Sequence, residues 1–174
     1  EKCRLDEIWI CPTSQSPHKK EKPPLISKEH RRALVVAAIA PLPYCTFLDL
    51  EIQKSEPSYT IETIQKLKSL DKKKKDYFLI LGEDCLNGLD KWKEIEQLLN
   101  LAPPLIGTRK GAGKDCLKKF SPNLKKVVEK GLVDIDQMEI SSTLIRERLK
   151  KRLFCGHLLP EKVAHYIQDH CLYE

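Results

Sequence analysis

The feature that most constrains the fold is the continuous apolar run Tyr77-Phe78-Leu79-Ile80-Leu81. Four lysines, Lys72 to Lys75, precede this run, and Gly82-Glu83-Asp84 follows it. A strand with one face in water alternates apolar and polar residues, whereas this run does not. It therefore predicts a central strand, buried on both faces, in a parallel sheet. The lysines predict a solvated turn before it.

Strand-like and helix-like segments alternate on both sides of this run. Further strands are expected at residues 7–10, 46–50, 105–107 and 132–135. Helices are expected from a Ser27 cap to the residue before Pro41, from a Thr60 cap onward, and over about 89–99, 124–130, 142–153 (stopped by Gly156) and 160–170. This order predicts an α/β fold with a doubly wound, mostly parallel sheet, whose ligands bind at the carboxyl ends of the strands.

The bulk properties predict one soluble domain over residues 1–174. The chain has 174 residues, 41% of them hydrophobic and 32% charged, and no internal repeat or Gly/Ser linker divides it. It contains no run of about 18 apolar residues and no signal-peptide pattern, so we expect a cytoplasmic protein. The net charge of +6 suits nucleic acid and phosphorylated small molecules equally and does not choose between them.

Cysteines and histidines are not arranged for a disulfide framework or a metal site. The seven cysteines are odd in number and never spaced as Cys-x-x-Cys, which favours free thiols in a reducing compartment. His157, His165 and His170 have no cysteine or carboxylate partner at ligand spacing, so we expect no metal bound by the protein.

Three hydroxyl residues, Ser141-Ser142-Thr143, stand where a basic helix begins. Unpaired backbone N–H groups and the helix dipole make such an end a binding place for phosphate. Arg146, three residues after Thr143, lies on the same helix face and can offer a bidentate contact to phosphate oxygens. The alternative interpretation is an ordinary hydroxyl cap followed by a solvated arginine.

Gly82-Glu83-Asp84 places a flexible glycine and a carboxylate at the ligand-bearing edge of the sheet. The Asp84 carboxylate could orient a ribose or an amide. Alternatively, Asp84 is the N-cap of the helix that follows.

Three further residues each allow two interpretations. Trp92 fits the apolar face of the expected helix and so predicts core packing, although a tryptophan near a strand end can also stack on a ligand ring. His18 and Lys19 lie in a polar, Pro-rich loop after the first strand, either as solvated basic residues or as a phosphate clamp.

Taken together, these residues resemble the nicotinate mononucleotide adenylyltransferase family of the nucleotidyltransferase superfamily, over nearly the whole chain. The matching segments are Pro17-His18-Lys19, Arg32, Ile39, Ser58-Tyr59-Thr60, Gly82-Glu83-Asp84, Trp92, Arg109, Ile140 to Arg146, Leu159-Pro160, Val163, Tyr166-Ile167 and Leu172-Tyr173. The Ser-Ser-Thr-x-Ile-Arg signature is shared across related adenylyltransferases, whereas the Ser-Tyr-Thr, Gly-x-Asp and Trp set narrows the match.

The resemblance implies a Rossmann-like fold and the transfer of an adenylyl group from ATP to nicotinate mononucleotide, giving deamido-NAD and pyrophosphate, with Mg²⁺ carried on the ATP. The implied ATP-binding residues are Gly82, Asp84, Ile140, Ser141, Ser142, Thr143 and Arg146, of which Ser142, Thr143 and Arg146 are the catalytic set. The implied mononucleotide-binding residues are His18, Lys19, Thr60, Trp92 and Arg109. Neither nucleic acid nor a membrane is an implied partner, and a homo-oligomer is left open.

One part of the family pattern has no counterpart in this sequence. The family begins with a glycine-rich strand and turn that ends in His-x-Gly-His, whose histidines meet the ATP phosphates. We expect about one β-α unit, roughly 20 to 30 residues, to be absent from this sequence. The absent strand would be central and would expose the edges of its neighbours, which indicates an incomplete chain.

Two rival functions stay open at this point. One is a sister nucleotidyltransferase that uses another phosphorylated substrate, such as phosphopantetheine. The other is a non-catalytic nucleotide-binding protein in which the histidine motif is naturally lost.

Overall fold

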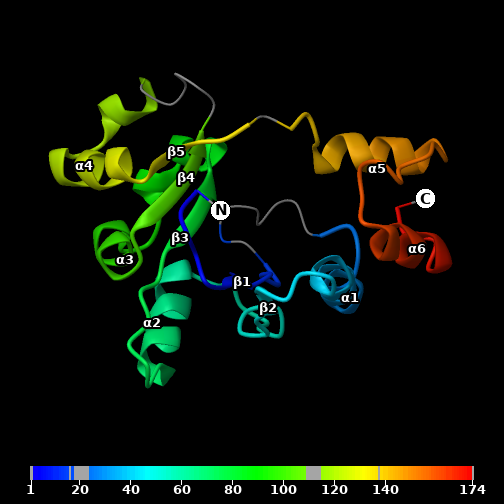
Figure 1. The fold of residues 1–174 in the computed structure, drawn as a ribbon, viewed down its shortest axis with the longest axis horizontal. Coiled ribbons are helices and arrows are strands. Elements are labelled where there is room, and N and C mark those ends of the chain that lie inside the picture. Colours follow the sequence, from blue (N-terminus) through cyan, green and yellow to red (C-terminus); the bar gives the residue numbers. More distant parts are fainter. Residues whose placement is uncertain (1, 16, 18–23, 109–114, 137, 174) are drawn as a thin grey trace. The chain divides into compact units, whose positions relative to one another are not determined.

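The computed structural model describes residues 2–15, 17, 24–108, 115–136 and 138–173 (Figure 1). These residues form two compact units. The first unit combines Glu1–Ser58 with Glu139–Glu174, and the second is Tyr59–Met138. None of the helices in the described ranges is long and apolar enough to cross a membrane.

The described residues of the first unit form a two-stranded parallel sheet and three α-helices. Its elements are β1 (Ile8–Ile10), α1 (Lys28–Ile39), β2 (Cys45–Phe47), α5 (Ser142–Lys150) and α6 (Glu161–Asp169). Strand β1 pairs with β2 in the register Ile8 to Cys45, and α1 is the crossover between them. The second strand is shorter than expected from the sequence, because it ends at Phe47.

The helices of the first unit begin and end at recognisable signals. Ser27 is the N-cap of α1, as predicted, and its side chain accepts a hydrogen bond from the backbone N–H of His30 at 3.3 Å. Helix α6 begins directly after Pro160, also as predicted. The Ser27 cap satisfies an N–H group that has no partner inside the helix.

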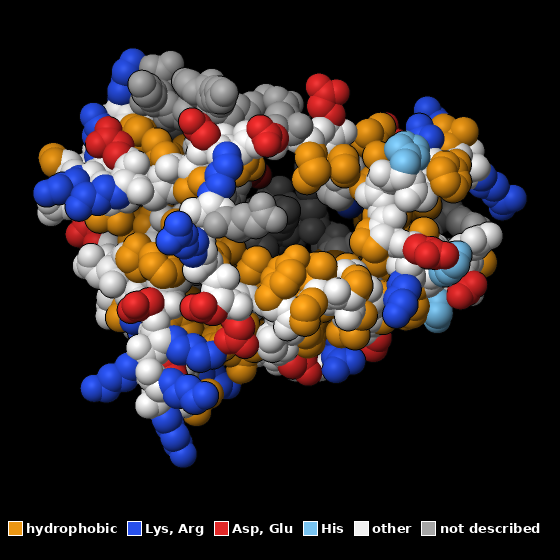
Figure 2. Space-filling model, viewed as in Figure 1, with side chains coloured by type: hydrophobic (Ala, Val, Ile, Leu, Met, Phe, Trp, Pro, Cys, Tyr) orange, Lys and Arg blue, Asp and Glu red, His pale blue; other side chains and the backbone are white. Residues whose placement is uncertain are grey.

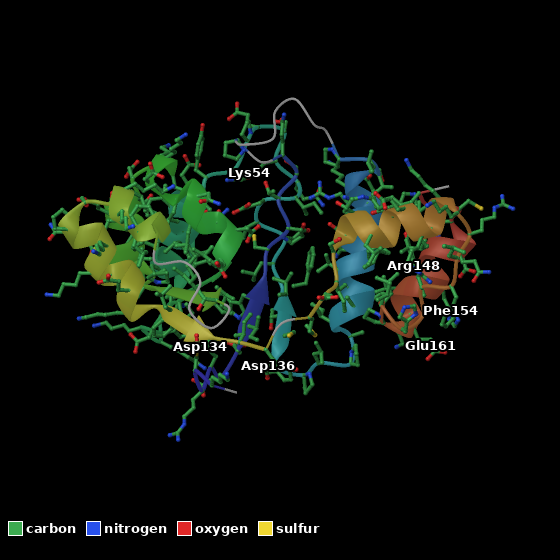
Figure 3. All side chains as sticks on the ribbon, turned by 90° about the horizontal axis from the view of Figure 1, so that it is seen from above. Lys54, Asp134, Asp136, Arg148, Phe154 and Glu161 are labelled. Atoms are coloured by element: carbon green, nitrogen blue, oxygen red, sulfur yellow. The ribbon has the colours of Figure 1, made fainter. Side chains whose placement is uncertain are left out.

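Helix α5 ends earlier than predicted, at Lys150, and Gly156 does not stop it. Arg152 adopts a left-handed conformation with φ 52°, and its N–H and that of Leu153 donate back to the carbonyls of Leu149 and Arg148. This is the Schellman arrangement, which closes a helix whichever residue follows. The Arg148 guanidinium also donates to the Phe154 carbonyl from Nε and Nη2, at 3.3 and 2.8 Å (Figure 3).

The core of the first unit lies between α1 and α6. Val163, Ile167 and Leu172 are buried there and pack against partly buried residues of α1 and α5. His30 of α1 adds a polar link, since its Nδ1 lies 3.1 Å from the Tyr166 hydroxyl. The apolar spacing predicted for α1 is therefore used to hold the two helices together.

The second unit has a three-stranded parallel sheet with helices between its strands. Its elements are α2 (Thr60–Leu70), β3 (Leu79–Gly82), the 3₁₀-helices η2 (Glu83–Asn87) and η3 (Leu89–Lys91), α3 (Ile95–Leu101), β4 (Pro104–Thr108), η4 (Asp115–Lys119), α4 (Pro122–Lys130) and β5 (Leu132–Asp134). The order is β3-β4-β5, with Leu79 opposite Pro104 and Ile106 opposite Leu132. All described strand pairs are parallel, which confirms the predicted α/β class.

The predicted central position of the apolar strand is wrong for the described chain. Strand β3 is at the end of its sheet, and burial alternates along it: Ile80 is 55% exposed whereas Leu79 and Leu81 are partly buried. Phe78, just before the strand, is 44% exposed. Within the described residues, only β4 pairs with β3, so the second edge and one face lack the cover that an all-apolar strand leads one to expect.

The core of the second unit lies between the sheet and helices α2, α3 and α4. Its buried residues are Ile61, Ile64, Leu86, Leu89, Leu98, Leu99, Ala102, Ile106, Leu117, Phe120, Leu124 and Val128. Among them Leu86, Leu98 and Val128 are fully buried, and each such side chain stabilises the fold by roughly 1.5 to 3 kcal/mol relative to an exposed one.

The single helix predicted over residues 89–99 is wrong. Helix η3 ends at Lys91, and α3 begins only at Ile95. Glu94 between them has φ 49°, a left-handed conformation that interrupts helical hydrogen bonding. Trp92 therefore lies on the connection between two helices, although it packs against the core as the apolar pattern predicted.

The four lysines before β3 form an exposed turn, as predicted. The Asp71 carboxylate accepts hydrogen bonds from the backbone N–H groups of Lys73 and Lys75, at 2.9 and 2.6 Å. Lys74 between them is left-handed, with φ 50°. Figure 2 shows lysine and arginine side chains gathered where α2 ends.

A chemical prediction arises from Cys11, which follows β1. Burial, followed by the charge of Glu51, raises the pKa of its thiol to about 11. About one Cys11 thiol in a thousand is then ionised at pH 8, against a substantial fraction of an ordinary thiol. We expect iodoacetamide to label Cys11 roughly 100-fold more slowly than the exposed Cys3 and Cys171, measured peptide by peptide by mass spectrometry. Equal rates at the three sites would contradict this.

Candidate nucleotide-binding site

The start of α5 has the geometry that the Ser-Ser-Thr segment predicts. Ser141 is the N-cap, and its hydroxyl accepts a hydrogen bond from the Leu144 N–H at 3.1 Å. Ser142 and Thr143 begin the helix and are exposed, and the preceding Ile140 is 46% exposed. Hydroxyls and helix N–H groups therefore meet at an open end of positive dipole, which suits an anion.

Arg146 stands on the same face of α5, as predicted from its spacing. Its Nη2 lies 3.5 Å from the Thr143 hydroxyl, so the guanidinium reaches back toward the helix N-terminus. Burial raises the pKa of the Tyr173 phenol, while the positive charges of Arg146 and Arg31 act in the opposite direction. The guanidinium thus adds a planar, bidentate donor group to the donors at the helix end.

In the second unit, Gly82 and Asp84 form a close pair at the carboxyl end of β3. A Cβ added at Gly82 would lie 2.5 Å from the Asp84 Oδ1, so a side chain at residue 82 would displace the carboxylate. The alternative of Asp84 as an N-cap is wrong, because Gly82 precedes η2 and Asp84 lies within its first turn. The Asp84 side chain is exposed and available as an acceptor.

Thr60 and Trp92 are linked through their neighbours. Thr60 is the first residue of α2; the prediction that it is the N-cap is wrong, because Tyr59 holds that position. Trp92 follows η3, and its N–H donates to the Leu89 carbonyl at 3.2 Å. The Lys93 Nζ donates to Glu62 Oε1 at 2.7 Å and lies 4.6 Å from the centre of the Tyr59 ring.

Not all predicted site residues can be placed. His18, Lys19 and Arg109 lie outside the described residues. Of the rest, Ile140, Ser141, Ser142, Thr143 and Arg146 are together in the first unit, and Gly82, Asp84, Thr60 and Trp92 belong to the second. Arg32, which the resemblance singled out, lies with its guanidinium carbon 5.3 Å from the centre of the Phe47 ring.

The sequence interpretation missed Arg31. Its guanidinium donates to the carbonyl of Ser14 at 3.0 Å and to that of Thr13, in the loop that follows β1. The Ser14 hydroxyl in turn donates to the Lys54 carbonyl at 2.6 Å. A signal was present, because Arg31 shares helical spacing with Leu34 and Ala38 and so places a charge on the buried face of α1.

Comparisons with known proteins identify the family of this chain. Residues 1–148 match the cytidylyltransferase-like family. The chain is 36% identical over 169 residues to the probable nicotinate-nucleotide adenylyltransferase of Oceanobacillus iheyensis, covering 97% of this chain and 82% of that protein. It is 36% identical to the same-named protein of Clostridium acetobutylicum, covering 99% of this chain and 86% of that protein.

Solved structures show the same fold. The Plasmodium falciparum nicotinic acid mononucleotide adenylyltransferase complexed with NaAD has a TM-score of 0.69 and 21% sequence identity, covering 97% of this chain and 83% of that one. The complex of that enzyme with APC gives a TM-score of 0.67 at the same identity and coverage. The chain therefore belongs to the cytidylyltransferase-like family and, within it, to the nicotinate mononucleotide adenylyltransferases.

Proposed function

We propose that this protein transfers the adenylyl group of ATP to nicotinate mononucleotide, giving deamido-NAD and pyrophosphate in NAD biosynthesis. The observation that carries the proposal is the start of α5, where the Ser141 cap, two exposed hydroxyls and Arg146 gather on one helix end. The family membership supports the choice of substrates, since the two relatives are named probable nicotinate-nucleotide adenylyltransferases.

In this reaction a phosphate oxygen of the mononucleotide attacks the α-phosphorus of ATP. A new P–O bond forms, the bond to the β-phosphate bridge breaks, and pyrophosphate leaves with its electron pair. Two polyanions must be held in line, so the task of the protein is to position them and to neutralise charge. We assign that task to Arg146, Ser142 and Thr143, with donors fixed before the reaction begins.

The remaining residues are assigned to binding. We assign four residues to ATP. Gly82 lets ATP approach the backbone closely, and Asp84 supplies a carboxylate acceptor. Ile140 and Ser141 directly precede the first turn of α5. On the mononucleotide side we assign Thr60, Trp92, His18, Lys19 and Arg109, with the Trp92 indole against the pyridine ring. An aromatic face and a basic group suit a ring that carries a phosphate.

Magnesium fits this site as an ion carried on the ATP phosphates. Within the described ranges, no three His, Cys, Asp or Glu side chains gather as metal ligands. Mg²⁺ in nucleotide sites keeps several waters and is held mainly by substrate phosphates, so no protein cage is required. When bound, Mg²⁺ would neutralise part of the phosphate charge. Arg146 and the N-terminus of α5 would neutralise a further part.

The test is a product assay on the full-length protein with ATP, Mg²⁺ and nicotinate mononucleotide. We expect deamido-NAD and pyrophosphate in equal amounts. Phosphopantetheine and nicotinamide mononucleotide serve as alternative acceptors in the same assay. Faster turnover of phosphopantetheine would replace the proposal by a sister nucleotidyltransferase, and ATP binding without product would favour a non-catalytic protein.

Two further proposals concern a cytoplasmic location and a homo-oligomeric state. Free thiols at Cys3, Cys11, Cys45, Cys85, Cys155 and Cys171 are compatible with a reducing compartment. Sedimentation of the active protein would separate a monomer from a homo-oligomer.

Gly82→Ala should weaken ATP binding at little cost in stability. The added methyl would displace the Asp84 carboxylate, which is a terminal group on an exposed side chain and can move. We expect the KM for ATP to rise roughly ten-fold, as for the loss of one charged hydrogen bond of about 1.5 kcal/mol. The control is Gly88→Ala, because an added Cβ there meets nothing within 4 Å. Equal KM values for the two variants would remove Asp84 from the ATP site.

A further inference from the structure

Lys93 directly follows Trp92, and its side chain contacts residues on both sides of Thr60. Its Nζ donates to Glu62 Oε1 at 2.7 Å, and the same ammonium group lies 4.6 Å from the centre of the Tyr59 ring. Tyr59 directly precedes Thr60, and Glu62 follows it by two residues in the first turn of α2. One side chain therefore contacts the helix start on both sides of a proposed substrate-binding residue.

The chemistry of the three groups is complementary. The hydrogen bond that the Lys93 ammonium donates to Glu62 raises the pKa of Lys93, so it stays charged throughout the neutral range. A charged ammonium over an aromatic face gains from the ring quadrupole. The Glu62 carboxylate also lies at the N-terminus of α2, where the helix dipole favours a negative charge. Removal of the ammonium charge would weaken the hydrogen bond to Glu62 and the contact with the Tyr59 ring together.

The backbone around Trp92 makes such a tether useful. Residues 92–94 lie between η3, which ends at Lys91, and α3, which begins at Ile95, and Glu94 is left-handed. The position of Trp92 therefore depends on its contact with the core and on what its neighbours hold. Trp92 and Tyr59 both pack against the same core cluster as partly buried residues.

We propose that Lys93 is a positioning residue, which holds Trp92 and Thr60 at the spacing that nicotinate mononucleotide requires. The inference rests on the proposed function, because that function assigns both residues to the mononucleotide. Lys93 acts through its neighbours and is not assigned to either substrate. It should therefore affect the KM for the mononucleotide and leave the ATP side of the reaction unchanged.

The test compares Lys93→Met, Lys93→Arg and the charge swap Glu62→Lys with Lys93→Glu in the full-length protein. We expect Lys93→Met to raise the KM for nicotinate mononucleotide about five-fold to ten-fold, with the KM for ATP within two-fold, since the ion pair and the cation–π contact are both lost. Lys93→Arg keeps both contacts and should restore the wild-type value. The charge swap keeps an ion pair with the charges exchanged, and its KM for the mononucleotide should lie between those of wild type and Lys93→Met.

The matched control is Lys125→Met, which removes a lysine of similar exposure from an ion pair with Glu129 on α4. This variant should leave both KM values unchanged. A mononucleotide KM that is the same in Lys93→Met and wild type would overturn the inference while the proposed function stands. A wild-type protein that makes no deamido-NAD would instead overturn the proposed function.

A second measurement tests the position of Trp92 without any substrate. The chain has two tryptophans, so a Trp9→Phe background leaves Trp92 as the sole indole fluorophore. We expect acrylamide to quench Trp92 at least two-fold more efficiently in Lys93→Met than in Lys93→Arg, because the tethered segment is released. Identical quenching in the two variants would show that Lys93 does not hold Trp92.

Discussion

Arg146→Ala should lower kcat/KM of the full-length protein by about 100-fold to 1,000-fold, the range found when a preorganised donor to transition-state charge is removed. The Arg146 guanidinium reaches back to the Thr143 hydroxyl at the N-terminus of α5, where we place the ATP phosphates. Negative charge moves toward the leaving pyrophosphate as the reaction proceeds. A bidentate cation at that point therefore stabilises the transition state more than the bound substrates.

Two further variants make this prediction specific. Arg146→Lys keeps the charge without the planar fork and should recover only part of the activity. Lys150→Ala removes an exposed charge from the last turn of the same helix and should change kcat/KM less than two-fold. Urea unfolding of the three variants checks that all are folded. If Arg146→Ala and Lys150→Ala had equal activity, Arg146 would have no part in the reaction.

The fold could be predicted from the sequence wherever a local signal agrees with the packing. Ser27 and Ser141 cap their helices because a hydroxyl before an apolar repeat satisfies free N–H groups in almost any context. The run at residues 105–107 predicted the strand β4, which extends over Pro104–Thr108 with Pro104, Ile106 and Thr108 buried. Periodicity and caps suffice for such elements.

The errors came from features that no local pattern contains. The burial of β3 depends on which strands and helices cover it, and an all-apolar run has the same letters whether or not its second edge is paired. The break after Trp92 and the end of α5 depend on left-handed conformations at Glu94 and Arg152. Neither residue is a glycine, so the sequence carries no sign of the turn.

The candidate site also contains some contacts that local sequence patterns predict and others that they do not. The hydroxyls and Arg146 could be placed on one helix face from spacing alone, because helix geometry fixes residues three apart. The Lys93–Glu62 pair could not, since its partners are 31 residues apart and meet only when α2 and α3 pack together. Contacts of that kind need the tertiary structure.

Trp92→Ala should raise the KM for nicotinate mononucleotide at least ten-fold and also destabilise the protein. The indole is partly buried against the core, so we expect about 2 kcal/mol lower free energy of unfolding, below the cost of truncating a fully buried aromatic residue. The loss of affinity has a separate cause, since stacking of the pyridine ring on an aromatic face contributes about 0.5 to 1.5 kcal/mol beyond buried area. Steady-state kinetics and urea unfolding measure the two effects independently.

The matched control for this prediction is Ile95→Ala, which truncates a partly buried side chain on the same core cluster three residues away. Ile95→Ala should lower the free energy of unfolding by about as much as Trp92→Ala does, while the KM for the mononucleotide stays within two-fold of wild type. Trp92→Phe keeps an aromatic face and should fall between wild type and Trp92→Ala in KM. Because Ile95→Ala matches the loss of packing but not the loss of the ring, a KM that rises equally in both variants would assign Trp92 to the core alone.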